Sequence, residues 1–149
     1  MEKSYKIIII EDEEYWQKVI VEMLSDPPYK TSVFSDYESA EKALKDQLFH
    51  FAIVDLRLLM DYHKNLDHSD EWGGWKVLQL IKDKSLNSNM GTMVLTWHDL
   101  KVFKDKATKD LGAIYFMSKR ELDEDEFINT IQHYFKYRDT SFNENPLKK

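Results

Sequence analysis

Short, uninterrupted apolar runs alternate along this chain with longer segments of helical periodicity. Four runs lie at residues 7–10, 51–54, 93–95 and 114–116, and a weaker one lies near residues 31–34. Runs that do not alternate with polar residues are typical of parallel strands buried on both faces. Strands that alternate with helices predict an α/β fold, built as a doubly wound, five-stranded parallel sheet with right-handed crossovers.

The segments between these runs carry the signals of five helices. Residues 35–38 have the form of a capping box that opens the second helix. Pro27 follows the end of the first helix, and Gly112 is a suitable C′ residue for the fourth. The helical periodicity covers residues 16–24, 35–48, 73–81, 99–111 and 123–135.

Composition limits the class of protein. With 149 residues, 42% of them hydrophobic, the chain suits one domain with a single core, which we expect over residues 1–138, followed by a polar tail or linker over 139–149. A formal net charge of −6 argues against direct nucleic-acid binding. The absence of cysteine excludes disulfides and thiolate metal sites. No apolar run is long enough for a signal peptide or a membrane span, so we expect a cytoplasmic protein without membrane contact.

Polar and charged residues follow the apolar runs at the points where the strands should end. Glu11 and Asp12 follow the first run, Asp55 and Thr96 follow two others, and Lys119 lies shortly after the last. The carboxyl ends of parallel strands share one edge of the sheet, where open α/β folds place their ligand sites. We therefore expect three carboxylates, a hydroxyl and an ammonium to converge there.

This set of side chains suits the transfer of a phosphoryl group. A strand-end aspartate can attack phosphorus and form an acyl phosphate, and Asp55 is the candidate. Mg²⁺ offsets the repulsion between carboxylate and phosphoryl group; Asp12 and Asp55 are the candidate direct ligands and Glu11 the second acid. Lys119 and Thr96 would bind the phosphoryl oxygens.

Four segments also resemble those of a known family. They are Ile-Ile-Ile-Ile-Glu-Asp-Glu at 7–13, Ile-Val-Asp-Leu-Arg-Leu at 53–58, Val-Leu-Thr at 94–96 and Gly-Ala-Ile-Tyr-Phe-Met-Ser-Lys at 112–119. Over residues 5–138 the chain resembles the receiver domain of bacterial two-component response regulators. The resemblance implies a flavodoxin-like (βα)5 fold with strand order 2-1-3-4-5.

By this resemblance, Asp55 accepts a phosphoryl group from a histidine kinase or histidine phosphotransfer protein, and the chain is a signalling module, not an enzyme. The backbone carbonyl of Arg57 completes the Mg²⁺ site, and Lys119 binds the phosphoryl group. Thr96 and Phe116 form a switch that changes the face made by the fourth helix, fifth strand and fifth helix. A plainer alternative for Phe116 is an ordinary core position.

The resemblance also implies surfaces for partners. Exposed residues of the first helix, such as Glu14, Tyr15 and Lys18, would dock the kinase. The switching face would bind a downstream protein, a fused output domain or a second copy of the chain. The acidic run at 123–126 is either a partner patch or charge that complements the dipole of the fifth helix.

The chain departs from the family pattern in a long loop after Asp55. The third helix opens at Gly73, so residues 59–72 contain an insertion of about ten residues. Three interpretations are open: a solvated polar loop, a lid or partner-selecting loop, or a transition-metal site made by His63, His68 and nearby acids.

Two further departures lie beside the phosphoryl-binding residues. Trp97 stands where the family usually has a small residue, and it either narrows access to Asp55 or packs on the fourth helix. His98 is either an ordinary exposed histidine or a group that titrates near neutral pH and modulates the same access. Arg120 replaces the family's cis-proline; we expect a trans bond, because a non-proline cis bond costs about 2.5–4 kcal/mol.

Two alternative functions follow from these departures. One is an atypical receiver that binds proteins independently of phosphorylation, which the unusual Trp97, Arg120 and long loop favour. The other is a Mg²⁺-dependent phosphatase with an aspartyl nucleophile. Such enzymes need a second aspartate two residues after the nucleophile, and this chain has Arg57 there.

Overall fold

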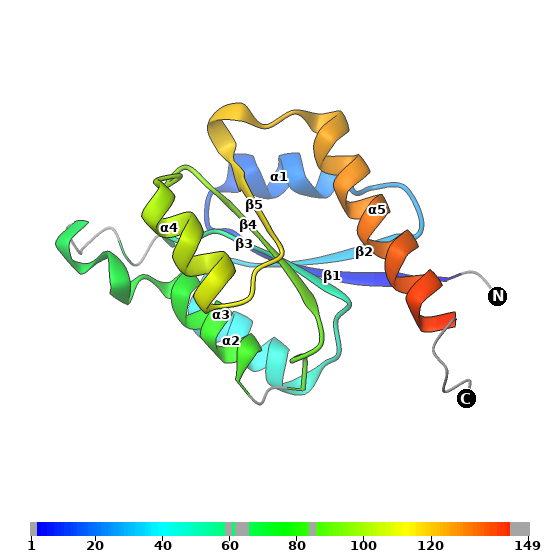
Figure 1. The fold of residues 1–149 in the computed structure, drawn as a ribbon, viewed down its shortest axis with the longest axis horizontal. Helices are drawn as coiled ribbons and strands as arrows, with labels where there is room; N and C mark the ends of the chain where they lie inside the picture. The colour runs from blue at the N-terminus through cyan, green and yellow to red at the C-terminus, as the bar shows by residue number, and fades with distance from the viewer. Residues whose placement is uncertain (1–2, 59–60, 62–65, 84–85, 144–149) are drawn as a thin grey trace.

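One parallel sheet organises the molecule (Figure 1). The structure is a computed structural model that describes residues 3–58, 61, 66–83 and 86–143. Its strands lie in the order β2-β1-β3-β4-β5, and every neighbouring pair is parallel, so the predicted fold class and strand order are confirmed. The strands are β1 (Tyr5–Ile10), β2 (Tyr29–Phe34), β3 (Phe51–Val54), β4 (Gly91–Thr96) and β5 (Tyr115–Ser118).

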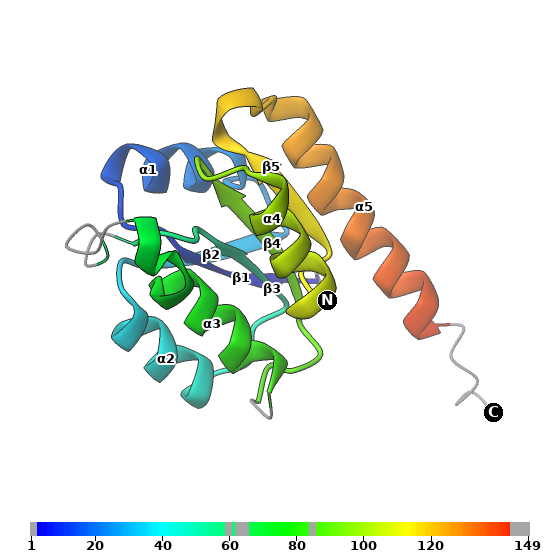
Figure 2. The same ribbon diagram turned by 60° about the vertical axis from the view of Figure 1, so that its left-hand side comes forward.

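Helices cover both faces of this sheet. In Figure 1 and Figure 2, α1 and α5 lie on one face and α2, α3 and α4 lie on the other. Short 3₁₀ and π segments join them to the strands. The α-helices of the described residues are α1 (Glu14–Met23), α2 (Tyr37–Asp46), α3 (Gly73–Lys82), α4 (Lys101–Asp105) and α5 (Glu124–Asn143). The short segments are η2 (Leu66–Glu71), η3 (Lys106–Asp110) and η4 (Lys119–Glu121).

The central strand β1 explains why its run does not alternate. Ile7 and Ile9 pack in the cluster beneath α1 and α5, whereas Ile8 and Ile10 pack in the cluster beneath α2, α3 and α4. All four side chains are fully buried because successive residues of a strand face opposite sides of the sheet. Each contributes roughly 1.5–3 kcal/mol of hydrophobic stabilisation.

The start of α2 differs from the predicted capping box. Its N-cap is Asp36, whose carboxylate accepts a hydrogen bond from the Ser39 backbone N–H (2.8 Å), so the box opening at Ser35 is wrong by one residue. A carboxylate at this position also complements the helix dipole. The helix ends at Asp46, and Leu48 beyond it is exposed.

The fourth helix is shorter and less regular than its periodicity predicts. It begins at Lys101 and passes at residue 106 into the π turn η3, where the Leu111 N–H donates to the Lys106 carbonyl (3.1 Å). Gly112 then adopts a φ of 77°, which confirms its predicted role in ending the helix. Asp99 remains in the segment between β4 and α4, outside the helix.

The last helix, α5, extends to Asn143, into the segment expected to be a tail. The Asp123 carboxylate accepts a hydrogen bond from the Asp125 N–H (3.0 Å), which favours the helix-terminus interpretation of the acidic run at 123–126. The boundary between domain and tail stays a prediction. No helix in the described part of the chain has the length and hydropathy needed to cross a bilayer.

The beginning of α3 lies against the segment that follows β3. The Gly74 N–H donates to the Leu56 carbonyl (3.0 Å), and a Cβ atom at Gly74 would lie 2.5 Å from Leu56 Cα and 2.7 Å from Leu56 O. Only glycine permits this approach, which holds the residues next to Asp55 in place.

We predict that Gly74→Ala destabilises the fold by about 1–3 kcal/mol, because backbone atoms must move to admit the methyl group. Gly73→Ala is the matched control: its Cβ would meet the flexible end of Leu58, with Cδ1 at 2.9 Å, so a smaller loss is expected. Urea unfolding of both variants gives the free energies of unfolding. Equal losses for the two would contradict the close-approach argument.

Candidate functional site

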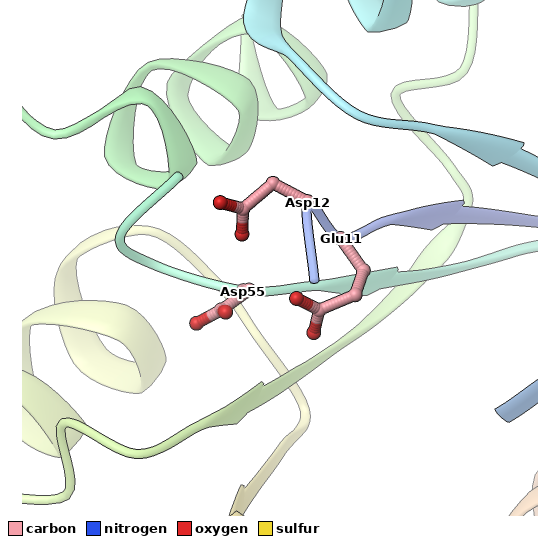
Figure 3. Close-up of side chains that lie close together, drawn as sticks. All are labelled: Glu11, Asp12 and Asp55. Atoms are coloured by element: carbon pink, nitrogen blue, oxygen red, sulfur yellow. The ribbon is translucent and has the colours of Figure 1, made fainter. Parts of the chain in front are cut away.

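Three carboxylates meet where β1 and β3 end (Figure 3). The Asp55 N–H donates to the Ile10 carbonyl (3.0 Å), which extends the pairing of the two strands up to the acids. Glu11, Asp12 and Asp55 each place one carboxylate oxygen within 4.8 Å of the others. Glu11 and Asp55 are buried and Asp12 is half-buried. The predicted convergence of these acids is therefore present.

Lys119 enters the same cluster from the end of β5. Its Nζ lies 2.7 Å from Glu11 Oε1 and 3.0 Å from Asp55 Oδ2, and its side chain is fully buried. Glu13 Oε2 lies 3.5 Å away, and Nζ is 5.1 Å from the centre of the Trp16 ring. Glu13 and Trp16 were not among the predicted site residues; position 13 within the acidic motif was the available signal for Glu13.

Burial and repulsion between the carboxylates raise the pKa values of two acids of the cluster. Burial, reinforced by the charge of Asp55, raises the pKa of Glu11 to about 8 and that of Asp12 to about 6. Burial alone would lower the pKa of Lys119, but Asp55 and Glu11 together raise it, so the ammonium stays charged. The cluster thus holds excess negative charge that one lysine only partly neutralises.

The carboxylates suit a hard divalent cation. Asp12 Oδ1 and Asp55 Oδ1 are buried without a hydrogen-bond partner among the described residues. Buried oxygens in this state need a proton donor or a cation, and carboxylates are ligands that Mg²⁺ prefers. Asp12, Asp55 and Glu11 are therefore the residues that would hold Mg²⁺. The part assigned to the Arg57 carbonyl stays a prediction.

The two predicted switch residues lie on the neighbouring strands β4 and β5. Thr96 is fully buried, and its Oγ1 accepts a hydrogen bond from the His98 N–H (3.2 Å). Phe116 is half-buried against the cluster beneath α2, α3 and α4, and it pairs in register with Val94, two residues before Thr96. This packing accommodates both interpretations of Phe116.

Trp97 contacts α1 rather than the fourth helix on which packing was one expectation, and His98 is partly buried. The Trp97 ring meets Trp16 of α1 edge-on, with ring centres 5.8 Å apart, and is 37% exposed. His98 is half-buried, with its ring 4.7 Å from that of Trp72. Burial lowers the pKa of His98, so the expectation of an ordinary exposed histidine is wrong.

The insertion is anchored at its base by buried residues. Asp61 is buried, and its Oδ2 accepts hydrogen bonds from the Leu58 N–H (2.9 Å) and the Gly73 N–H (2.8 Å). Trp72 is fully buried, with the Arg57 guanidinium 5.6 Å from its ring. The interpretation as a purely solvated loop is therefore wrong for these residues.

The proposed metal site within the insertion is described only in part. His63 lies outside the described residues. His68 is exposed, with its Nδ1 3.5 Å from Glu71 Oε2. The transition-metal hypothesis stays a prediction.

Comparison with solved structures identifies the fold. The chain matches a CheY-like response regulator receiver domain protein from Methanospirillum hungatei JF-1 with a TM-score of 0.75 and 13% identity, covering 93% of this chain and 99% of that one. It matches the signal receiver domain of an HD domain-containing protein from Pseudomonas fluorescens Pf-5 with a TM-score of 0.76 and 16% identity, covering 93% and 99%. This chain has the receiver fold.

A third neighbour with the receiver fold contains a magnesium ion. It is the receiver domain of a sensor histidine kinase from Pseudomonas aeruginosa PAO1, with a magnesium ion coordinated in its active site cleft. The TM-score is 0.68 and the identity 19%, covering 87% of this chain and 96% of that one. No family model and no curated protein sequence matches the chain.

We predict that Asp12→Asn stabilises the metal-free protein at pH 8 but not at pH 4. Asp12 has a pKa of about 6 in the fold against an ordinary 3.8, so the native state favours the protonated carboxyl group. Its contribution to the free energy of unfolding is therefore fully present below about pH 4 and is lost as the pH rises through 6. Removing the charge should raise the Tm at pH 8 by roughly 2–4 °C, the shift caused by about 1 kcal/mol in a domain of this size.

Thermal unfolding at both pH values, with a chelator present, measures this shift. Asp110→Asn changes an exposed aspartate far along the chain from the cluster and should leave the Tm unchanged at either pH. A rise of equal size at pH 4 and pH 8 for Asp12→Asn would contradict the electrostatic explanation.

Proposed function

We propose that this chain is a signalling module in which Asp55 accepts a phosphoryl group from the phosphohistidine of a histidine kinase or phosphotransfer protein, with Mg²⁺ bound. It acts as a stoichiometric acceptor and not as an enzyme. The state of the Asp55 carboxylate carries this proposal. Its Oδ2 is paired with Lys119 at 3.0 Å, while its Oδ1, beside two further acids, is buried with no hydrogen-bond partner in the part of the chain that the structure describes.

In the proposed reaction an Asp55 carboxylate oxygen forms a bond to phosphorus as the bond between phosphorus and the donor's imidazole nitrogen breaks. The electron pair of that bond leaves with the imidazole. Lys119 supplies positive charge to the phosphoryl oxygens, and the Thr96 hydroxyl supplies a hydrogen bond. Mg²⁺, held by Asp12, Asp55 and Glu11, would neutralise the charge that develops on these oxygens.

The proposed output is a shift of the face formed by α4, β5 and α5. The Thr96 hydroxyl oxygen accepts the His98 N–H, so drawing this hydroxyl toward a phosphoryl group would also move the segment that leads into α4. Leu100 and Val102, at the start of α4, are 61% and 65% exposed, which provides apolar surface for a downstream partner. On α1, the exposed residues Glu14, Tyr15 and Lys18 are the proposed kinase contacts.

We predict that acetyl phosphate with Mg²⁺ adds one phosphoryl group to the wild-type protein and none to Asp55→Asn, because the amide is a poor nucleophile. Intact-mass spectrometry measures the adduct. Asp110→Asn, at an exposed aspartate, is the control and should be modified like the wild type. An adduct on Asp55→Asn would refute the assignment of the acceptor. No adduct on the wild type, with phosphorylated donor proteins also inactive, would refute the function and leave the phosphorylation-independent module.

We predict that Mg²⁺ stabilises the protein through these acids. At a concentration one hundred times its Kd, a ligand that binds only the native state adds about 2.7 kcal/mol, which raises the Tm. Asp12→Asn should abolish the Mg²⁺-dependent part of this rise, although its metal-free Tm is higher. A calorimetric titration checks binding directly, and unchanged Mg²⁺ affinity in Asp12→Asn would contradict the ligand assignment.

A further inference from the structure

The turn that carries Lys119 lacks the proline usual in the resembled family. Among the described residues the cis peptide bond is Pro27–Pro28, so the bond between Lys119 and Arg120 is trans, as expected. Lys119 instead begins the short 3₁₀ segment η4, capped by Ser118, whose Oγ accepts the Arg120 N–H (3.1 Å). The position of the ammonium therefore depends on what holds Ser118 and Arg120.

The Asp99 side chain, in the loop that follows β4, contacts both Ser118 and Arg120. The Ser118 hydroxyl donates to Asp99 Oδ2 (2.7 Å), and Arg120 Nε lies 3.3 Å from the same oxygen. Arg120 Nη2 also donates to the Trp97 carbonyl (3.3 Å). Asp99 lies three residues after Thr96, so these bonds join the segment after β4 to the segment after β5.

Aromatic contacts connect the same two segments to α1. The Arg120 guanidinium lies 5.8 Å from the Trp97 ring, which meets the Trp16 ring edge-on. The Trp16 ring in turn lies 5.1 Å from Lys119 Nζ. The Lys119 ammonium thus contacts the acids Glu11 and Asp55 directly. The turn that carries it is connected to Asp99 through Ser118 and Arg120.

The bond between Asp99 and Ser118 is the strongest member of this chain. It is short, its acceptor is charged and both residues are half-buried, which makes it stronger than a bond between neutral groups. The ion pair with Arg120 is weaker, since the arginine side chain is 62% exposed and the solvent screens it. The Ser118 hydrogen bond, aided by Arg120, lowers the pKa of Asp99, so its carboxylate is charged at neutral pH.

We propose that Asp99 is a positioning residue for Lys119: by holding Ser118 and Arg120 it fixes the turn that places the ammonium between Glu11 and Asp55. Its effect on phosphoryl transfer rests on the proposed function, whereas its effect on the placement of Lys119 does not. The two effects can therefore be measured separately.

The first measurement is the exchange of the Lys119 ammonium protons with water, followed by NMR on ¹⁵N-labelled protein. In the wild type this fully buried ammonium should be protected. Asp99→Ala should increase the exchange rate about tenfold and Asp99→Asn less, because the amide can still accept the Ser118 hydroxyl. Unchanged exchange in Asp99→Ala, with the fold intact by its amide spectrum, would overturn the proposal.

Asp105→Asn is the matched control. Asp105 is an aspartate of similar exposure, and its ion pairs among the described residues are with Lys101 of α4 and Lys109 of η3 rather than with the turn after β5. It should leave the exchange of the Lys119 ammonium unchanged. An equal increase in this control would show a general loosening of the fold and would also overturn the proposal.

Ser118→Ala provides an independent variant, because it removes the same bond from the other side. Asp99→Ala and Ser118→Ala should each accelerate exchange, and the double variant should add little to either, since both single changes break one link. Fully additive effects would contradict a shared link.

The second measurement is the rate of phosphorylation by acetyl phosphate. Asp99→Ala should slow it about fivefold, corresponding to about 1 kcal/mol in the barrier, with Mg²⁺ affinity unchanged. Faster ammonium exchange with an unchanged rate would overturn the positioning role. If the wild type itself takes no phosphoryl group, the proposed function fails, and the exchange measurement alone decides whether Asp99 places Lys119.

Discussion

The contact of one buried ammonium with two buried carboxylates determines how the rest of the site is built. Lys119 lies 2.7 Å from Glu11 and 3.0 Å from Asp55, in a region from which water is largely excluded. The desolvation of these charges is costly, and a single ammonium does not balance the acids. The ends of three strands bring these charges together. Two carboxylate oxygens, Asp12 Oδ1 and Asp55 Oδ1, have no hydrogen-bond partner among the described residues, so a cation or a proton donor would satisfy them.

The sheet was predictable because its signals are local and redundant. An isoleucine run such as 7–10 is typical of a strand buried on both faces in the middle of a parallel sheet, and the acids that follow it then fall at the carboxyl edge. For the same reason Glu11, Asp12, Asp55 and Lys119 could be placed together, and Thr96 at the end of the neighbouring strand, without any knowledge of side-chain contacts. Their separation in sequence does not matter once strand direction and order are known.

The surroundings of the site were not predictable in the same way. Whether Ser35 or Asp36 caps α2 depends on a single hydrogen bond, and periodicity does not distinguish the two. The contact of Trp97 with Trp16 joins the segment after β4 to α1, and no spacing rule relates these two residues. Asp99 illustrates the limit best: in the sequence it is one more polar residue at a helix start, and its role follows only from the position of Ser118 in space.

The base of the insertion has a consequence for how this protein can vary. The Asp61 carboxylate accepts hydrogen bonds from the N–H groups of Leu58 and Gly73 and so joins the two ends of the insertion. Trp72 packs beside Arg57, His98 and Phe103. These contacts fix the positions of Leu58 and Gly73, the residues that flank the insertion. Changes within the insertion that keep Asp61 and Trp72 would therefore leave the backbone joined on either side of it, three residues after Asp55.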